Sequence, residues 1–353
     1  MSETLEPSNF DGLLDWPKLN AWIEANDLPG EGPVTSAERL TGGSQNNIFL
    51  MTRGSGQFVL RRPPKHLRAN SNQTMLREAR VLQALKGSDV PHPAFYAVCE
   101  DTSVIGATFY AMAPLEGFTP SRALPGGYGS DPSWRHAMGG EFMRAAAALA
   151  SIDIKAAGLE DFGKPDNWHA RQVARWRSQL DGYLEMPGYD GHTLPHLDEL
   201  QRWLSDNVPT DGRIGLTHGD FQFANVMFSY KAPKITGVID WEMTTVGDPM
   251  LDLGWVLGAW WEEGDPRDPL VTPWDSFVSR AELVKMYGDL TGRDMGNVLW
   301  YAGLACWKLG CVLEGSYARA KGGLIPMELG ESLHGHAVGL FLKAKMLIDR
   351  GGI

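Results

Sequence analysis

The chain has 353 residues, of which 43% are hydrophobic and 21% are charged, and its formal net charge is −11. This length is more than one compact core accommodates, and it predicts about two lobes or domains of ~150 residues each. The acidic balance argues against nucleic-acid binding, which needs a basic patch, and against electrostatic attachment to an acidic membrane.

The sequence shows no targeting signal, and its cysteines follow no recognised functional spacing. The first residues lack the basic start and apolar core of a secretion signal, and no apolar run approaches the ~20 residues of a membrane span. Cys99, Cys306 and Cys311 show neither metal-ligand nor disulfide-framework spacing, which indicates buried thiols in a reducing compartment. We expect a cytoplasmic protein with no membrane partner, and a monomer or a homodimer are both open.

The N-terminal third of the chain reads as a helix followed by strands. Apolar residues at helical spacing predict a leader helix at 16–23, and strand-like runs occupy 34–60. An apolar stripe closed by a glycine predicts a second helix at 72–85. Two further strand-like runs follow, at 94–99 and 108–112.

After residue 117 the patterns become mainly helical. They predict a long alanine-rich helix at 134–154, amphipathic helices at 168–184 and 196–207, and tryptophan-rich apolar segments at 251–261 and 297–313. Most of the tryptophans are expected to pack in the core. The acidic residues that follow the first of these segments are expected to face water, with contact to a cationic ligand as the alternative: Glu262, Glu263 and Asp265.

Polar side chains follow two short apolar runs, 214–217 and 235–239. The first run opens onto Asp220 and Asn225, and the second opens onto Asp240. Aspartate, asparagine and a second aspartate, in that order along the chain, are the minimal set of side chains for phosphoryl transfer from Mg-ATP. Asp220 would accept the proton of the attacking hydroxyl, while oxygen atoms of Asn225 and Asp240 would hold Mg²⁺ on the phosphates. His218, Asp248 and Asp252 are expected to brace the loop or cap a helix.

Three pieces of this stretch resemble the aminoglycoside phosphotransferase family and its choline-kinase-like relatives. They are HGD-x-x-x-x-N at 218–225, IDW at 239–241, and GDP-x-x-D at 247–252. The first also has the spacing of the protein-kinase catalytic loop. The resemblance implies an α+β fold of the protein-kinase-like, two-lobed type. The implied parts are a leader helix with a small nucleotide-binding lobe at 1–113, a hinge at 114–120, and a helical lobe at 121–353.

The resemblance also implies nucleotide contacts in the small lobe. Arg61 stands where the kinase pattern has a phosphate-binding lysine, and the Leu-Arg followed by prolines is similar to kinase-like domains associated with acyl-CoA dehydrogenases. By strand alternation only one of Arg61 and Arg62 can face the nucleotide, and we choose Arg61, paired with Glu78. A glycine-rich turn would cover the phosphates, although it also suits an ordinary hairpin: Gly42, Gly43, Ser44, Gln45 and Asn47.

The hinge implied by the resemblance would hold the adenine. If Ala113 offers its carbonyl and Leu115 its N–H, Pro114 falls on the position that needs no donor. The predicted function is transfer of the ATP γ-phosphate to a hydroxyl of a small-molecule acceptor, with a hydroxyacyl compound suggested by the acyl-CoA-dehydrogenase-associated branch. An aminoglycoside, choline-like or sugar acceptor is the alternative, and a nucleotide-binding pseudokinase module is a second. A protein kinase is disfavoured because no A-P-E segment follows Asp240.

Overall fold

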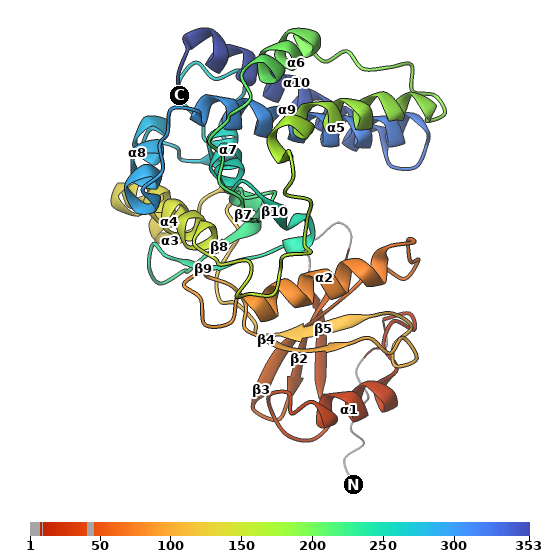
Figure 1. The fold of residues 1–353 in the computed structure, drawn as a ribbon. Coiled ribbons are helices and arrows are strands. Elements are labelled where there is room, and N and C mark those ends of the chain that lie inside the picture. Colours follow the sequence, from red (N-terminus) through yellow and green to blue (C-terminus); the bar gives the residue numbers. More distant parts are fainter. Residues whose placement is uncertain (1–7, 9, 41–45) are drawn as a thin grey trace. The chain divides into compact units, whose positions relative to one another are not determined.

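The structure of the protein is a computed structural model that describes residue 8 and residues 10–40 and 46–353. The predicted phosphate-covering residues Gly42, Gly43, Ser44 and Gln45 therefore lie outside the described residues. The chain forms two compact units (Figure 1). The small unit comprises residues 1–117 and 236–242, and the large unit comprises residues 118–235 and 243–353.

The small unit is built on one antiparallel sheet with strand order β1-β2-β3-β5-β4. Its side chains alternate between the two faces, and Leu60 and Ala111 pack in the apolar core with residues of α1. Arg61 and Tyr110 lie on the opposite face, where both contact Glu78 of α2. Helix α2 covers that face of the sheet (Figure 1). Its elements are α1 (Trp16–Ala25), β1 (Ser36–Leu40), β2 (Asn47–Arg53), β3 (Gly56–Arg62), α2 (Ser71–Ala84), β4 (Phe95–Cys99) and β5 (Phe109–Met112).

The chain passes between the units at β9 (Ile235–Val238) and at the short helical turn η3 (Trp241–Met243). The large unit is mainly helical, with two-residue or three-residue strands between the helices. Its elements are β6 (Arg122–Ala123), α3 (Gly126–Ser130), α4 (Pro132–Ala150), α5 (Trp168–Gly182), η1 (Tyr183–Glu185), α6 (Leu197–Asp206), β7 (Gly215–Thr217), η2 (Phe223–Asn225), β8 (Val226–Phe228), β10 (Thr245–Gly247), α7 (Met250–Ala259), β11 (Val271–Thr272), α8 (Arg280–Thr291), α9 (Val298–Lys321) and α10 (Met327–Arg350).

Helix α4 shows how local sequence sets an element in this unit. The helix begins at Pro132, earlier than the pattern at 134–154 predicts, because the Asp131 carboxylate accepts from Ser133 N and proline fits the first turn. It buries a face that includes Met138, Phe142 and Leu149. Nearby, α7 packs on α9, and α9 runs along α10.

The buried residues confirm one expectation and correct another. All three cysteines are buried, and so are Trp255, Trp260, Trp300 and Trp307. The expectation that the acidic residues after α7 face water is wrong for Asp265, whose side chain is 3% exposed, whereas the Glu262 side chain is 32% exposed. Glu262 and Asp265 both pair with Arg280, at 2.8 and 3.1 Å, because that guanidinium is itself buried and needs anionic partners. Glu263 is exposed, as expected.

Candidate active site

The catalytic-loop sequence begins directly after β7, which pairs antiparallel with β10 in the register Thr217↔Thr245. Asp252, in the first turn of α7, accepts hydrogen bonds from His218 N at 2.8 Å and from Gly219 N at 2.9 Å. The Asp252 side chain is buried, so these bonds are not exchanged with water. Asp252 thus braces the backbone of the loop, as the sequence predicts.

Asp220 is held by two neighbours on its own loop. Its Oδ1 accepts from Gln222 Nε2 at 2.6 Å, and its Oδ2 accepts from Asn225 Nδ2 at 2.7 Å. Asn225 Nδ2 also donates to the Asp220 carbonyl at 2.9 Å. Both of these Asn225 bonds use the amide nitrogen, so the amide oxygen is the atom left to face a cation.

Gly219 has a backbone conformation that needs glycine. Its φ is +83°, and a Cβ at this position would lie 2.5 Å from the carbonyl oxygen of Met243. The next peptide is fixed as well, because Asp220 N donates to His218 Nδ1 at 3.3 Å. His218 is fully buried, which agrees with a bracing role.

Lys308 on α9 contacts the same loop. Its ammonium donates to the Gly219 carbonyl at 2.5 Å, and it lies over the rings of Trp176 and Trp255 at 5.4 and 5.1 Å. Burial lowers the pKa of Lys308 to about 8, although the carboxylates of Asp220 and Asp252 oppose this decrease.

Asp248 is the centre of a buried polar network behind the loop. Its carboxylate accepts from Tyr301 Oη at 2.8 Å, from Arg293 Nη1 at 2.7 Å and from Met250 N at 3.0 Å, and it lies 3.0 Å from His169 Nε2. Burial by itself raises the pKa of Asp248, but the donors His169 and Arg293 outweigh it and hold the pKa at about 2.

In the small unit, Arg61 joins two carboxylates. Its Nε lies 2.8 Å from Glu78 Oε2, and its Nη2 donates to Asp240 Oδ1 at 2.8 Å. Tyr110 Oη donates to Glu78 Oε2 at 2.9 Å. Burial alone lowers the pKa of Arg61, but Glu78, Tyr110 and Asp240 raise it overall, so the guanidinium stays charged.

Asp240 combines a strained backbone with a partly exposed carboxylate. Its φ is +66°, an unusual value for a residue other than glycine, and such conformations cluster at functional sites. The side chain is 39% exposed, and the pair with Arg61 uses only one of its oxygens. A magnesium ion, which takes one or two carboxylates together with phosphate oxygens, could therefore bind the other.

Two other predicted small-unit residues make contacts within the fold. Arg62 points away from Arg61 and donates to the carbonyls of Leu13 and Ile105 at 2.5 and 3.1 Å. Asn47 is buried, and its Nδ2 donates to the Pro63 carbonyl at 3.1 Å. The amide nitrogen of Asn47 is thus engaged inside the sheet, and a phosphate contact by this residue stays a prediction.

The predicted hinge residues lie directly after β5. Ala113 N donates to the Ala94 carbonyl at 2.8 Å, which ties the start of the hinge to the sheet. The Leu115 side chain packs on Gly237, where a Cβ would lie only 2.4 Å from Leu115 Cδ1. The first contact fixes the backbone at Ala113, the second involves only the Leu115 side chain, and use of either residue by an adenine stays a prediction.

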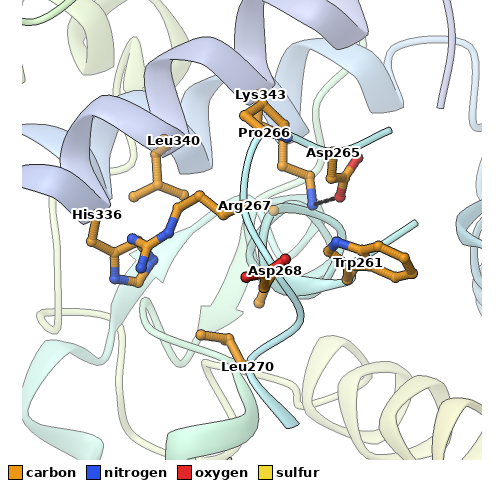
Figure 2. Close-up of a pocket in the computed structure, with 12 residues that line it drawn as sticks. Trp261, Asp265, Pro266, Arg267, Asp268, Leu270, His336, Leu340 and Lys343 are labelled. Carbon is orange, nitrogen blue, oxygen red and sulfur yellow. Dashed lines mark ion pairs between the residues drawn. The ribbon is translucent and has the colours of Figure 1, made fainter. Parts of the chain in front are cut away.

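Gln222, the residue that donates to Asp220, also lines a small hollow in the large unit. We call it the Gln222 hollow, and it is mainly apolar: Gln222, Trp255, Gly258, Ala259, Leu270, Ala305, Cys306, Leu309, His336 and Leu340. A second hollow shares five of these lining residues, namely Gly258, Ala259, Leu270, His336 and Leu340. Figure 2 shows this second hollow, where Arg267 lies beside His336 and Lys343 pairs with Asp265 at 2.9 Å.

Sequence reasoning placed the loop residues but missed three side chains of the site. Tyr110 and Gln222 carry no pattern of their own, since their roles depend on neighbours in space. Lys308 had a signal: it is the only charged residue in the apolar segment 297–313. A lone charge in an apolar helix needs a partner, so its presence indicates a buried polar site.

The class of protein follows from the strand-rich small unit, the helical large unit and the braced loop. Residues 36–292 match the family model described as "Phosphotransferase enzyme family". This match covers more than half of the chain, so the chain belongs to that family. The predicted α+β fold of the protein-kinase-like type is confirmed by solved structures of a putative aminoglycoside phosphotransferase and of a macrolide 2'-phosphotransferase.

Individual relatives come from two groups. A "putative aminoglycoside phosphotransferase" of Ralstonia eutropha JMP134 is 30% identical, with a TM-score of 0.78 and coverage of 94% of this chain and 98% of that chain. The GDP complex of aminoglycoside 2'-phosphotransferase-IIIa has a TM-score of 0.62 at 14% identity, covering 91% and 98%. "Acyl-CoA dehydrogenase family member 11" of Rattus norvegicus is 30% identical over 320 residues, 87% of this chain but 40% of that protein.

The chain thus spans about two fifths of the length of this curated relative. No helix in the described part of the chain has the length and apolar character needed to cross a membrane. Among the described residues there is also no cluster of three or more His, Cys, Asp or Glu side chains suited to a metal ion.

Proposed function

We propose that the protein is an ATP- and Mg²⁺-dependent kinase that transfers the γ-phosphate to a hydroxyl of a small molecule. The observation that carries the proposal is the Asp220 carboxylate, which Gln222 and Asn225 hold on a loop braced by Asp252. Phosphoryl transfer depends mainly on positioning and electrostatics, so a fixed carboxylate of this kind is the feature the reaction needs.

Asp220 would act as the general base. It orients the acceptor oxygen toward the γ-phosphorus and takes the hydroxyl proton as the new P–O bond forms and the bond to the β-phosphate oxygen breaks. The proton ends on Asp220, and ADP leaves with the electrons of the broken bond. Arg61 would neutralise phosphate oxygens, since its guanidinium is charged and is held in place by Glu78.

The residues fit a magnesium ion by their chemistry. Asn225 has an amide oxygen to offer, and Asp240 has a carboxylate oxygen that its pair with Arg61 leaves unused. Magnesium binds oxygen ligands and keeps water and phosphate in its remaining positions, so a cluster of protein carboxylates is not required. When bound, the ion would neutralise charge that develops on the phosphates.

For the acceptor we propose a hydroxyacyl compound. Gln222, which donates to the proposed base, lines the mainly apolar Gln222 hollow, and an apolar wall suits an acyl chain better than a polycationic sugar. The proteins named acyl-CoA dehydrogenase that resemble this chain point to the same chemistry. We further propose a cytoplasmic location, and division into the lobes 1–113 and 121–353 joined by a hinge at 114–120.

The test is consumption of Mg-ATP and of Mg-GTP across a panel of hydroxyl compounds that includes hydroxyacyl-CoAs, aminoglycosides, choline and sugars. Asp220→Asn should lower acceptor-dependent turnover roughly 10²- to 10⁴-fold while the nucleotide still raises the melting temperature. Asp294→Asn, a change at an exposed carboxylate, is the matched control and should keep full turnover.

Each outcome is informative. Turnover with an aminoglycoside rather than a hydroxyacyl compound would keep the kinase and refute the acceptor. If Mg-ATP stabilises the protein but no acceptor of the panel raises turnover, a nucleotide-binding module is favoured. If neither nucleotide binds nor turns over, the phosphotransferase proposal is wrong.

A further inference from the structure

Lys308 is a buried cation that the proposed reaction does not use directly. It lies in the middle of α9 and is 5% exposed. Burying an ammonium ion is costly unless partners replace its water, so a lysine at this position needs a physical reason.

Lys308 contacts the catalytic loop directly, and two tryptophan rings from neighbouring helices lie near its ammonium group. The ammonium donates to the Gly219 carbonyl at 2.5 Å, and the attraction of Asp220 and Asp252 partly offsets its burial. The rings of Trp176 on α5 and Trp255 on α7 lie 5.4 and 5.1 Å away and stabilise the charge through their π faces. Repulsion from Arg175 opposes the charge on Lys308.

Gly219 is therefore held on both sides. Asp252 accepts from its N–H at 2.9 Å, and Lys308 donates to its carbonyl at 2.5 Å. That carbonyl belongs to the peptide group that also contains the N–H of Asp220. Asp220 N also donates to His218 Nδ1 at 3.3 Å, so this peptide is held at its N–H as well as at its carbonyl. Glycine has few intrinsic restraints on its backbone, so loss of the Lys308 contact would leave the peptide freer to rotate and to carry Asp220 with it.

We propose that Lys308 is a positioning residue for Asp220: it fixes the Gly219–Asp220 peptide and thereby aims the carboxylate at the acceptor hydroxyl. This inference rests on the proposed function for its catalytic meaning. Its structural content, that Lys308 orders the loop 217–226, can be tested without any activity.

The experiment compares Lys308→Met, Lys308→Gln and Lys308→Arg with the native chain. Arg135→Met is the matched control, because Arg135 is also a buried cation of the large unit that donates to backbone carbonyls, those of Tyr128 and Asp275. Hydrogen–deuterium exchange of peptides covering 217–226 reports the order of the loop. Hydrolysis of Mg-ATP, in which water replaces the acceptor, reports kcat and the KM for ATP.

In Lys308→Met the loop amides should exchange at least tenfold faster, with other helices of the large unit unchanged. The kcat should fall roughly 10²-fold with little change in KM, because a misplaced base slows the chemical step rather than nucleotide binding. Lys308→Gln keeps a donor without the charge and should lie between, and Lys308→Arg should recover most of kcat. In Arg135→Met, kcat and loop exchange should stay near native values.

Unchanged loop exchange in Lys308→Met and Lys308→Gln would overturn the proposal, as would a loss of kcat no larger than in Arg135→Met. Failure of the proposed function looks different. In that case the native chain would not hydrolyse Mg-ATP at all, while the exchange measurements would still decide whether Lys308 orders the loop.

Discussion

Asp248 offers a stability test whose size can be worked from its surroundings. The carboxylate is fully buried and accepts hydrogen bonds from Arg293, Tyr301 and Met250. Burial raises the pKa of Asp248, but its donors more than compensate and lower the pKa from 3.8 to about 2. A carboxyl group with this difference between unfolded and folded states contributes roughly 2 kcal/mol to the free energy of unfolding.

The direction of the pH dependence follows from the linkage between protonation of Asp248 and folding. Because the folded pKa is the lower one, the contribution is complete above pH 4 or so, and it is lost as pH falls toward 2. Asp248→Asn leaves buried donors with an amide that cannot accept all of their bonds. We expect a cost of roughly 3 kcal/mol at pH 7, of which roughly 1 kcal/mol disappears at pH 3.

The assay is urea unfolding followed by tryptophan fluorescence at pH 7, 5 and 3, with the native chain measured at each pH. Asp289→Asn, at an exposed carboxylate that pairs with Lys285 on α8, is the matched control and should cost less than about 0.5 kcal/mol. A cost for Asp248→Asn that is the same at pH 7 and pH 3 would refute the linkage argument. A cost no larger than that of the control would refute the buried network as a source of stability.

Two further substitutions test single contacts by urea unfolding. Gly219→Ala adds a Cβ 2.5 Å from Met243 O at φ +83° and should lower the free energy of unfolding by roughly 2–5 kcal/mol. Gly292→Ala, at φ +63° with open space around it, should lower it by about 1–2 kcal/mol. Equal costs would mean that backbone strain alone, not the close approach, explains Gly219. Tyr110→Phe removes the donor to Glu78 and should lower the free energy of unfolding by about 1–3 kcal/mol. Tyr287→Phe removes a buried hydroxyl that has no described hydrogen-bond partner, and it should leave the free energy of unfolding nearly unchanged. Similar values for both tyrosines would argue against a stabilising Tyr110–Glu78 bond.

The parts of the site that the sequence predicted are those encoded over short distances. Asp220 and Asn225 lie on one loop, and the apolar runs before that loop and before Asp240 set where each strand ends. Helices such as α2 and α4 were found because their apolar periodicity is local. The contact between Lys308 and Gly219 joins residues 89 positions apart, so no local pattern could place it. The same holds for Asp265, whose burial depends on a guanidinium from α8.

The arginine at position 61 departs from the kinase lysine, and the geometry gives a physical account of the departure. The guanidinium reaches Glu78 with Nε at 2.8 Å and Asp240 with Nη2 at 2.8 Å, so two of its nitrogens serve two carboxylates at once. A lysine carries its charge on one compact ammonium group and could not reproduce both contacts, whereas the planar guanidinium presents several donors in a fixed geometry. Arg61 stays charged at every pH at which the protein is folded, and its Nη2 donates to one oxygen of Asp240. In a kinase, that pair would orient the Asp240 carboxylate, whose second oxygen is the one proposed to bind magnesium.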